Sequence, residues 1–304
     1  MFGLQNYRYV ACYTLFYQSF MNIEVNKLYF ENCIEVLKRL PDNSIDAYIQ
    51  DPPFEVTANE WDKGFIENLP ILWELWIKKG KSNAPFIFKA TFPFANDLIN
   101  SKPKEFKYYE WIWKKNKYTN FVNAKWQPMR CFEYIFIFYR KKDYTYNPIL
   151  RKNITAGANR GNNFKSTKIY NIRETETSKN YVKKTEDYGQ PINLLDIRFE
   201  NEAFDSSNGS QNRHPNRTNP ELWKYFIRTY TNEGDLVFDG YTGSGSVPQA
   251  AIELNRNWIA CENSKEYFSD TENRLLNTKE IKEHGYAKTN LTTNQNSLFF
   301  GQVL

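Results

Sequence analysis

The chain has 304 residues, of which 41% are hydrophobic and 25% charged, as in a globular protein long enough to bury a sizeable core. No run approaches the ~18 apolar residues of a membrane helix, which argues against a membrane protein. Four widely spaced cysteines and only two histidines argue against a zinc site and a disulfide framework, and they favour a reducing cytoplasm.

Alternating strands and helices are predicted for the first part of the chain. Residues 1–21 lack a repeating pattern and are predicted to be an irregular N-terminal extension. After them, short β-branched and aromatic runs predict strands at 28–30, 45–50 and 84–90, and helical spacing of apolar residues predicts helices at 33–40, 66–79 and 94–100. Trp73 and Trp76 fall on the apolar face of the second helix, where core packing is favoured over ligand contact.

The strand 45–50 leads into Asp51, Pro52, Pro53 and Phe54. Pro52 holds Asp51 extended, and the two proline rings make a rigid corner after the strand. Open α/β sheets bind ligands beyond the carboxyl ends of their strands, so the corner presents a carboxylate and an aromatic ring at the ligand edge. The carboxylate can accept from an exocyclic amine, and the ring can stack on a flat heterocycle. The alternative is a solvated aspartate on a Pro-Pro loop, since four residues recur by chance.

Two alternating, aromatic-rich segments, 106–113 and 131–139, predict a pair of strands. The connection 114–130 is long, and long loops tend to be functional. From residue 140 the periodicity fades until about residue 215. Residues 140–184 carry 12 Lys and Arg against 3 Asp and Glu, which favours contact with a polyanion over a merely solvated arm.

Regular structure is predicted again after this basic segment. Asn219 and Pro220 have the residue types that cap and begin a helix, and that helix is expected to end near residue 232. The expected elements that follow are a strand 235–239, a glycine-rich turn, a helix to residue 255, a strand 258–261 and a helix from residue 264, with a polar tail after residue 277.

The glycine-rich turn contains Gly240, Gly243 and Gly245, and the next strand leads to Glu262, 17 residues beyond Gly245. Glycines let the backbone pass under a ligand, and the acid can accept both hydroxyls of a ribose. The spacing is neither G-x-G-x-x-G nor G-K-[ST], so a dinucleotide pyrophosphate or a triphosphate is not specifically indicated. Asp239 would repel a phosphate and favour a cationic or amino-acid ligand. A glycine turn without a ligand is the simpler alternative.

Together these motifs resemble the site-specific DNA amino-methyltransferases that use S-adenosylmethionine. The likeness covers about residues 22–139 and 212–275, and the catalytic motif precedes the cofactor motif, as in the permuted β group of that family. The resemblance implies a Rossmann-like α/β sheet with an inserted target-recognition region. The implied domains are an N-terminal extension 1–21, a discontinuous catalytic domain 22–139 and 212–277, a recognition insertion 140–211 and a tail 278–304.

The resemblance rests on three blocks: Asn32 to Asp46 with Asp51 to Phe54 and Trp61-Asp62; Trp113 to Tyr139; and His214-Pro215 to Glu262. It departs from the family's pattern at Glu31-Asn32, at 216–220, at Gly240-Tyr241 and at Phe54, where Tyr is commonest. The implied catalytic residues are Asp51, Pro52, Pro53 and Phe54. The implied cofactor-binding residues are Asn32, Cys33, Asp239, Gly240, Tyr241, Gly243, Ser244, Gly245, Glu262 and Asn263. The expected DNA-binding residues are Asn123, Arg130, Arg151, Lys152, Lys183 and Lys184.

The implied reaction is methyl transfer from S-adenosyl-L-methionine to the exocyclic N6 of adenine in a specific duplex sequence, with the base flipped out of the stack. Adenine is favoured because in this family Asp at the first motif position goes mostly with adenine. Methylation of cytosine N4 is the main alternative, and an RNA or protein methyltransferase or a catalytically silent DNA-binding homologue is less favoured. Double-stranded DNA is the expected partner in a bacterial or phage cytoplasm, without a metal. A homodimer and a cognate restriction endonuclease are left open.

Overall fold

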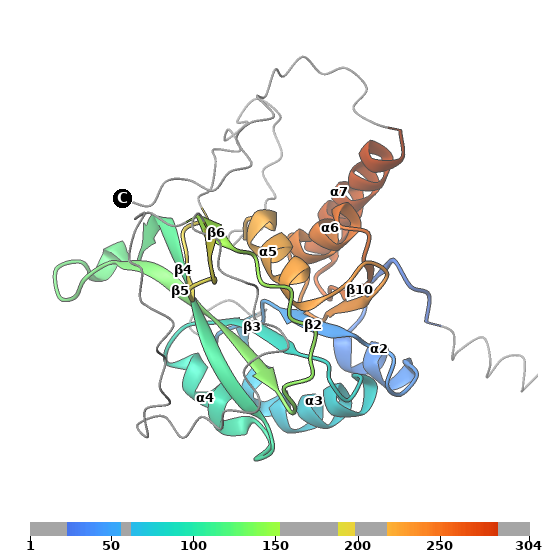
Figure 1. Cartoon of the computed structure of the whole chain (residues 1–304), viewed down its shortest axis with the longest axis horizontal. Coiled ribbons are helices and arrows are strands. Elements are labelled where there is room, and N and C mark those ends of the chain that lie inside the picture. Colours follow the sequence, from blue (N-terminus) through green and yellow to red (C-terminus); the bar gives the residue numbers. More distant parts are fainter. Residues whose placement is uncertain (1–22, 56–61, 153–187, 198–217, 285–304) are drawn as a thin grey trace, which may run out of the picture. The chain divides into compact units, whose positions relative to one another are not determined.

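A computed structural model of the chain describes residues 23–55, 62–152, 188–197 and 218–284 (Figure 1). The chain divides into two compact units, one comprising Met1–Tyr146 and Leu194–Leu304, and the other Asn147–Asn193. Within the described ranges, no helix is both long enough and apolar enough to cross a membrane.

The larger unit is built on an eight-stranded sheet. Its strands are β1 (Lys27–Tyr29), β2 (Ala47–Gln50), β3 (Phe86–Ala90), β4 (Lys107–Thr119), β5 (Arg130–Tyr139), β8 (Leu194–Leu195), β9 (Leu236–Asp239) and β10 (Asn257–Cys261). Their order is β1-β10-β9-β2-β3-β5-β4-β8. The strands from β1 to β3 in this order are parallel, whereas β5 is antiparallel to both β3 and β4. This mixed α/β sheet confirms the predicted fold class.

Helices cover both faces of the sheet (Figure 1). On one face lie α2 (Cys33–Arg39), α3 (Phe65–Lys79) and α4 (Phe94–Ser101), and on the other lie α5 (Pro220–Tyr230), α6 (Ser246–Glu253) and α7 (Lys265–His284). The Asn32 side chain accepts a hydrogen bond from the Ile34 N–H at 2.8 Å and caps α2. Asn219 caps α5 in the same way, with Pro220 at the first helical position, as the sequence predicts.

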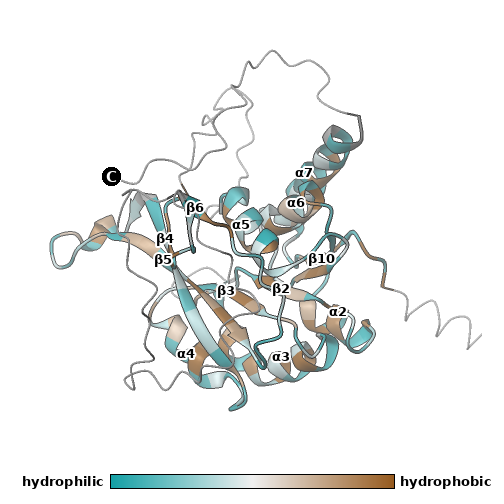
Figure 2. Ribbon diagram, in the orientation of Figure 1, coloured by the Kyte–Doolittle hydropathy of each residue, from teal (hydrophilic) through white to brown (hydrophobic). Residues whose placement is uncertain are grey.

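An aromatic core fills the space between the sheet and α3. Trp73 and Trp76 are buried, and the two rings lie edge to face with centroids 5.3 Å apart. Tyr48 of β2 stacks on Phe86 of β3 at 4.6 Å. Figure 2 shows that the apolar side of α3 faces the sheet. The prediction that the two tryptophans belong to the core is therefore confirmed, and such rings bury much apolar surface each.

Three boundaries differ from the prediction. The strand β4 runs to Thr119, although a loop was expected from residue 114. Its lysines obscure the alternation of apolar and polar residues that marks a strand, because Lys115 pairs with Glu133 and Lys114 pairs with Asp196. The strand β8 pairs with β4 in the main sheet, although it lies in the expected insertion. The helix α7 runs to His284, so residues 278–284 are helical and not part of a loose tail.

The smaller unit is described only in part. Its strand β6 (Arg151–Lys152) pairs antiparallel with β7 (Tyr188–Gly189), and the Arg151 Nε donates to the Gln190 carbonyl at 3.1 Å. Most of the predicted insertion and the N-terminal extension lie outside the described residues. Their expected roles remain predictions.

Candidate active site

The strand order reverses between β9 and β2, and the two predicted acids Asp51 and Asp239 flank this point. The chain passes from β2 through α3 to β3 on one side, and from β9 through α6 to β10 on the other. In open α/β sheets the ligand lies at such a switch point, beyond the carboxyl ends of the strands. Asp51 follows β2 and Asp239 ends β9, so the topology brings the catalytic corner and the glycine-rich turn to one edge.

Gln50 links the end of β2 to the end of β9 and to the glycine-rich turn at this edge. Its side chain is fully buried, with Nε2 donating to the Phe238 carbonyl at 2.9 Å and Oε1 accepting from the Gly240 N–H at 3.1 Å. A Cβ on Gly240 would lie 3.1 Å from both Gln50 Oε1 and Cys33 Cβ, which is why a glycine occupies this position. The last residue of β2 thus fixes the position of the glycine-rich turn relative to Asp51.

A buried cluster of charged and polar groups holds the Asp51 carboxylate. Its Oδ2 lies 2.7 Å from the Lys89 ammonium and accepts from the Thr218 hydroxyl at 2.9 Å. Lys89 also donates to Thr218 at 2.8 Å and lies 3.6 Å from a carboxylate oxygen of Glu133. The other oxygen of Glu133 pairs with Lys115 at 2.6 Å. Asp51, Lys89, Thr218, Glu133 and Lys115 therefore form one network, called here the Asp51 network.

The charges of the Asp51 network stabilise one another. Burial opposes the ammonium form of Lys89, but Asp51 and Glu133 outweigh that effect and raise the pKa of Lys89. Burial also opposes the ionised form of Glu133, but Lys89 and Lys115 outweigh it and lower the pKa of Glu133. Both groups are therefore charged at neutral pH.

Phe54 completes the corner after the two prolines. Its backbone N–H and that of Glu55 both donate to Asp62 Oδ1, at 2.8 and 2.9 Å, so a buried carboxylate fixes the loop. Glu55 has a φ of 54°, and its side chain accepts from the N–H of Ile66 in α3. The Phe54 ring stacks on Phe94 with centroids 5.2 Å apart. The ring is thus positioned by both backbone and packing.

The glycine-rich turn is held against α7. Gly243 and Gly245 have φ values of 51° and 80°, a region that favours glycine. A Cβ on Gly245 would come within 2.8 Å of Thr271, whose hydroxyl donates to the Gly243 carbonyl. Arg274 donates to the Ser244 carbonyl at 2.6 Å. These contacts give the turn one conformation.

Glu262 closes the turn from the neighbouring strand. Its carboxylate accepts from the Gly243 N–H at 2.9 Å and from the Ser264 N–H at 2.7 Å. Burial raises the pKa of Glu262, and these N–H bonds oppose the increase. A carboxylate offers about four acceptor positions, so capacity remains for two ribose hydroxyls. Asn263, also predicted to bind the cofactor, is exposed beside it.

Asp239 is a buried acid that suits a cationic ligand. Burial raises its pKa to about 8, and the negative charges of Asp51 and Glu262 add to the effect. Within the part of the chain that the structure describes, no basic side chain forms an ion pair with Asp239. An ammonium or sulfonium group at this edge would favour the ionised carboxylate. The Asp239 carboxyl therefore fits a cationic nucleoside such as S-adenosylmethionine.

The remaining predicted cofactor residues lie on the same edge. The Cys33 thiol donates to the Tyr241 hydroxyl at 3.3 Å, and the Tyr241 ring meets Phe65 edge to face at 5.1 Å. Burial raises the pKa of Cys33 to about 11, so its thiol is neutral. Asn32 is exposed, but its side-chain oxygen already caps α2.

The predicted DNA-binding residues are divided between the two units. Asn123 lies in the short 3₁₀ helix η2 (Phe121–Asn123) of the β4–β5 connection, and its amide donates to Asn120. Arg130 begins β5 and donates to the Thr91 hydroxyl at 2.9 Å and to the Phe92 carbonyl at 3.2 Å. The rest of this set comprises Arg151 and Lys152, which form β6 in the smaller unit, and Lys183 and Lys184, which lie outside the described residues.

No role was predicted for Gln50, Lys89, Glu133 or Thr218, although the structure places all four at the site. One signal was present, because Lys89 is a charge within the buried strand Phe86–Ala90 and must have a partner. Thr218 directly precedes the cap of α5, a position with no chemical signature of its own. In the described part of the chain, no group of His, Cys, Asp or Glu is placed to hold a metal ion.

The switch-point edge of this α/β sheet combines a buried carboxyl that fits a cationic ligand with a carboxylate that can accept from an amine. A family model described as DNA methylase, for N6 and N4 methyltransferases, matches residues 45–273. The chain therefore belongs to the N6/N4 DNA methylase family, as the sequence motifs indicate. It is an S-adenosylmethionine-dependent DNA methyltransferase.

Curated relatives agree with this assignment, and solved structures share the fold. The type II methyltransferase M1.MboII of Moraxella bovis is 25% identical over 85% of this chain and 99% of that protein. M.BamHI of Bacillus amyloliquefaciens is 24% identical over 83% of this chain, which spans 60% of that protein. The M1.HpyAVI–SAM complex shares the fold with a TM-score of 0.50 at 20% identity, covering 82% of this chain and 98% of that one. The cytosine-N4-specific PvuII methyltransferase shares the fold with a TM-score of 0.53 at 17% identity, and the match covers 84% of this chain and 91% of that one.

Proposed function

We propose that the enzyme methylates the exocyclic N6 of adenine in a specific duplex sequence. The observation that carries the proposal is the Asp51 carboxylate, held at the switch point by Lys89 and Thr218. An ionised carboxylate is an acceptor only, and the adenine amino group offers two N–H donors. The family resemblance also associates Asp at this position with adenine.

The target base must leave the helical stack, because its amine is inaccessible inside the duplex. Phe54 would hold the flipped ring by stacking, worth about 1–3 kcal/mol. Asp51 would accept one N–H of the amine, and the carbonyl of Pro52, within the corner that Pro53 stiffens, would accept the other. These bonds draw the nitrogen lone pair out of conjugation with the ring. Catalysis is then positioning and electrostatics by fixed groups.

S-adenosylmethionine supplies the methyl group when bound. Glu262 would accept the ribose hydroxyls, and Asp239 would pair with a positive group of the cofactor. The glycine-rich turn would let the backbone lie close to the bound cofactor. The residues proposed to line this site are Asn32, Cys33, Asp239, Gly240, Tyr241, Gly243, Ser244, Gly245, Glu262 and Asn263.

Mass spectrometry of the product base tests the proposal. Purified protein is incubated with S-adenosylmethionine and unmethylated genomic DNA, which is then digested to nucleosides. N6-methyladenine is expected, and Asp51→Ala is expected to give none. N4-methylcytosine as the sole product would overturn the choice of adenine. Cytosine is the second candidate because the cytosine-N4-specific PvuII enzyme shares this fold.

The basic insertion is proposed to contact the phosphates of the target duplex. Arg151 and Lys152 lie in the described part of the smaller unit, and Lys183 and Lys184 belong to the same basic segment of the sequence. Neutralising these four residues should weaken DNA binding and reduce its salt slope by about 0.9 for each lost contact. An unchanged slope would leave the segment as a solvated arm.

The relatives' designation as type II methyltransferases supports a further pairing with a restriction endonuclease of the same specificity. An extract of the source cells should cut unmethylated DNA and spare DNA that this enzyme has methylated. A homodimer is also proposed. Sedimentation at increasing concentration tests it, and a monomer throughout would refute it.

A further inference from the structure

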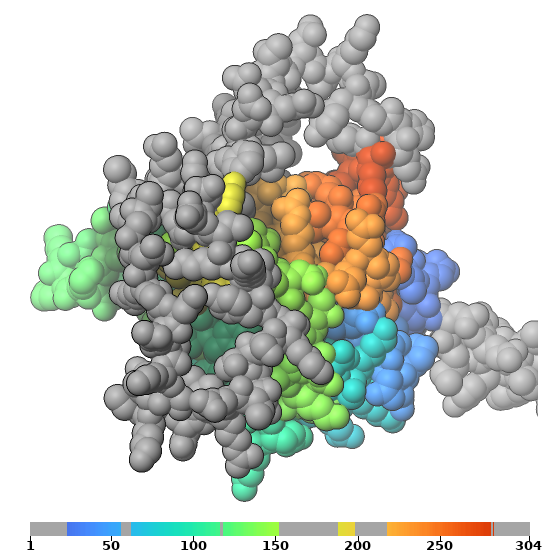
Figure 3. Space-filling model, in the orientation of Figure 1, coloured from blue at the N-terminus to red at the C-terminus, as the bar shows by residue number. Residues whose placement is uncertain are grey.

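The hairpin of β4 and β5 extends beyond the parallel strands at the edge where Asp51 lies. Pairing of β5 with β3 ends where Ala90, the last residue of β3, meets Tyr134. The two hairpin strands continue to Thr119 and Arg130, which adds about 13 Å at ~3.3 Å per residue. Residues 118–129, called here the hairpin tip, therefore lie beyond the carboxyl end of β3 and stand out from the body (Figures 1 and 3).

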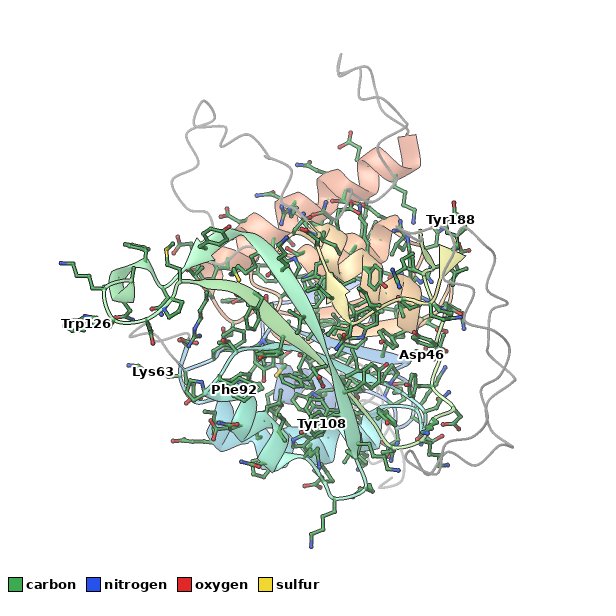
Figure 4. All side chains as sticks on the ribbon, turned by 60° about the vertical axis from the view of Figure 1, so that its left-hand side comes forward. Asp46, Lys63, Phe92, Tyr108, Trp126 and Tyr188 are labelled. Atoms are coloured by element: carbon green, nitrogen blue, oxygen red, sulfur yellow. The ribbon has the colours of Figure 1, made fainter. Side chains whose placement is uncertain are left out.

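The hairpin tip exposes large apolar side chains. Single exposed apolar residues are ordinary, but a patch of them marks a binding surface. Figure 4 shows Trp126 projecting from the tip, at the other end of the hairpin from Tyr108. The exposed fractions are 62% for Tyr118, 75% for Phe121, 75% for Val122, 87% for Trp126 and 45% for Met129.

The positive charge around the hairpin tip indicates which kind of partner covers this apolar patch. Residues 114–132 contain five Lys and Arg and no Asp or Glu. Lys114 pairs with Asp196 and Lys115 with Glu133, whereas Arg130 donates to the neutral oxygens of Thr91 and Phe92. The charges of Lys125 and Arg130 are therefore not neutralised by any acid among the described residues. A second copy of the chain would bring the same charge to an interface, whereas DNA brings phosphates.

We propose that the hairpin tip binds duplex DNA beside the target base, with Phe121 and Trp126 packing against bases next to the gap that the flipped base leaves. Proteins insert apolar side chains between base steps in this way, and an aromatic ring can stack on any base. Arg130 ties the root of the tip to the loop after β3, so the tip keeps a fixed position relative to the catalytic edge. This inference rests on one part of the proposed function, namely that the target base is flipped out of the duplex.

The test compares Phe121→Ala and Trp126→Ala with Tyr108→Ala, an exposed aromatic control from the far end of the same hairpin. Unmethylated genomic DNA, which supplies the target sequence, is methylated with labelled S-adenosylmethionine at several DNA and salt concentrations. Each tip variant should lose roughly 5- to 150-fold in the apparent affinity for this DNA, taken from the dependence of the methylation rate on DNA concentration, with its salt slope unchanged. Lys125→Ala should lower the salt slope by about 0.9. The Tyr108→Ala control should behave as the wild type does.

The tip variants should bind cofactor normally, because the tip carries none of the residues proposed for that site. Wild-type affinity and methylation rates in both tip variants would overturn the proposal. So would a loss of activity that tracks a loss of dimer in sedimentation, because the patch would then join two copies. If the wild type makes only N4-methylcytosine, the choice of adenine fails while the affinity measurements still test the tip.

Discussion

Replacing Lys89 by methionine tests whether the Asp51 network positions the carboxylate that is proposed to be catalytic. Methionine keeps most of the length but removes an ammonium that lies 2.7 Å from Asp51 and 3.6 Å from Glu133. Breaking a buried ion pair without compensation costs about 3–5 kcal/mol. Here Thr218 still donates to Asp51, and Lys115 still pairs with Glu133, so a loss of about 2–4 kcal/mol in unfolding free energy is expected.

Lys89→Met should also slow the methyl-transfer reaction. A small misplacement of a catalytic group can cost about 100-fold in rate, so kcat should fall by about that factor. Cofactor affinity from calorimetry should stay within about 2-fold, because that site lies across the switch point. Lys89→Arg, which keeps the charge, should recover much of the stability. A folded Lys89→Met enzyme with kcat near wild type would refute the reasoning.

A surface ion pair supplies the matched control. Lys81 pairs with Asp46 at 2.6 Å, but its side chain is 47% exposed, so Lys81→Met should cost no more than about 1 kcal/mol and leave kcat unchanged.

The loss of stability in Lys89→Met should also depend on pH. The lowered pKa of Glu133 contributes stability above its ordinary value of 4.5 that is lost as pH falls through the folded pKa. The stability difference between wild type and Lys89→Met should therefore shrink below about pH 4.5.

Three further substitutions separate the roles at the site. Asp51→Ala should abolish methylation and leave cofactor affinity intact, and near-wild-type turnover would show that another group accepts the amine. Glu262→Gln should weaken cofactor binding by about 1–3 kcal/mol, since it alters an acceptor of ribose and of the Gly243 N–H; unchanged affinity by calorimetry would remove the ribose role. The Asp239 pKa of about 8 lies above its ordinary 3.8, so the cofactor-free protein should lose stability as pH rises between these values. Denaturant titrations of Asp239→Asn should lack that slope, and an identical slope would contradict the assignment.

Local motifs made the positions of the predicted site residues in the fold predictable. Asp51 and Glu262 each directly follow a predicted strand, so their position at the carboxyl edge follows from the order of elements. Gln50 and Lys89 were not assigned roles, because their partners lie across the sheet: Gln50 reaches Phe238, and Lys89 reaches Glu133 and Thr218. A single sequence carries no record of such pairs.

The extent of the β4–β5 hairpin was missed for a related reason. The polar composition around Lys114 and Lys115 predicts a loop. In the folded protein, however, Lys114 pairs with Asp196 and Lys115 with Glu133, and these acids come near only when the sheet has formed. Tertiary pairing therefore outweighed local preference. The same holds for Leu194 and Leu195, which form β8 because the edge of β4 offers them backbone partners.

The hydrogen bonds of Gln50 also have a consequence for the order of folding. They join residues 188 and 190 positions apart, Gln50 to Phe238 and to Gly240. Contacts of such high sequence separation require the closure of a very large loop, and they form slowly. On the ribosome Asp51 emerges early, but no methylation site exists until β9 has been synthesised and has docked against β2. We therefore expect a chain interrupted before that point to carry the Asp51 corner without the glycine-rich turn, and not to modify DNA.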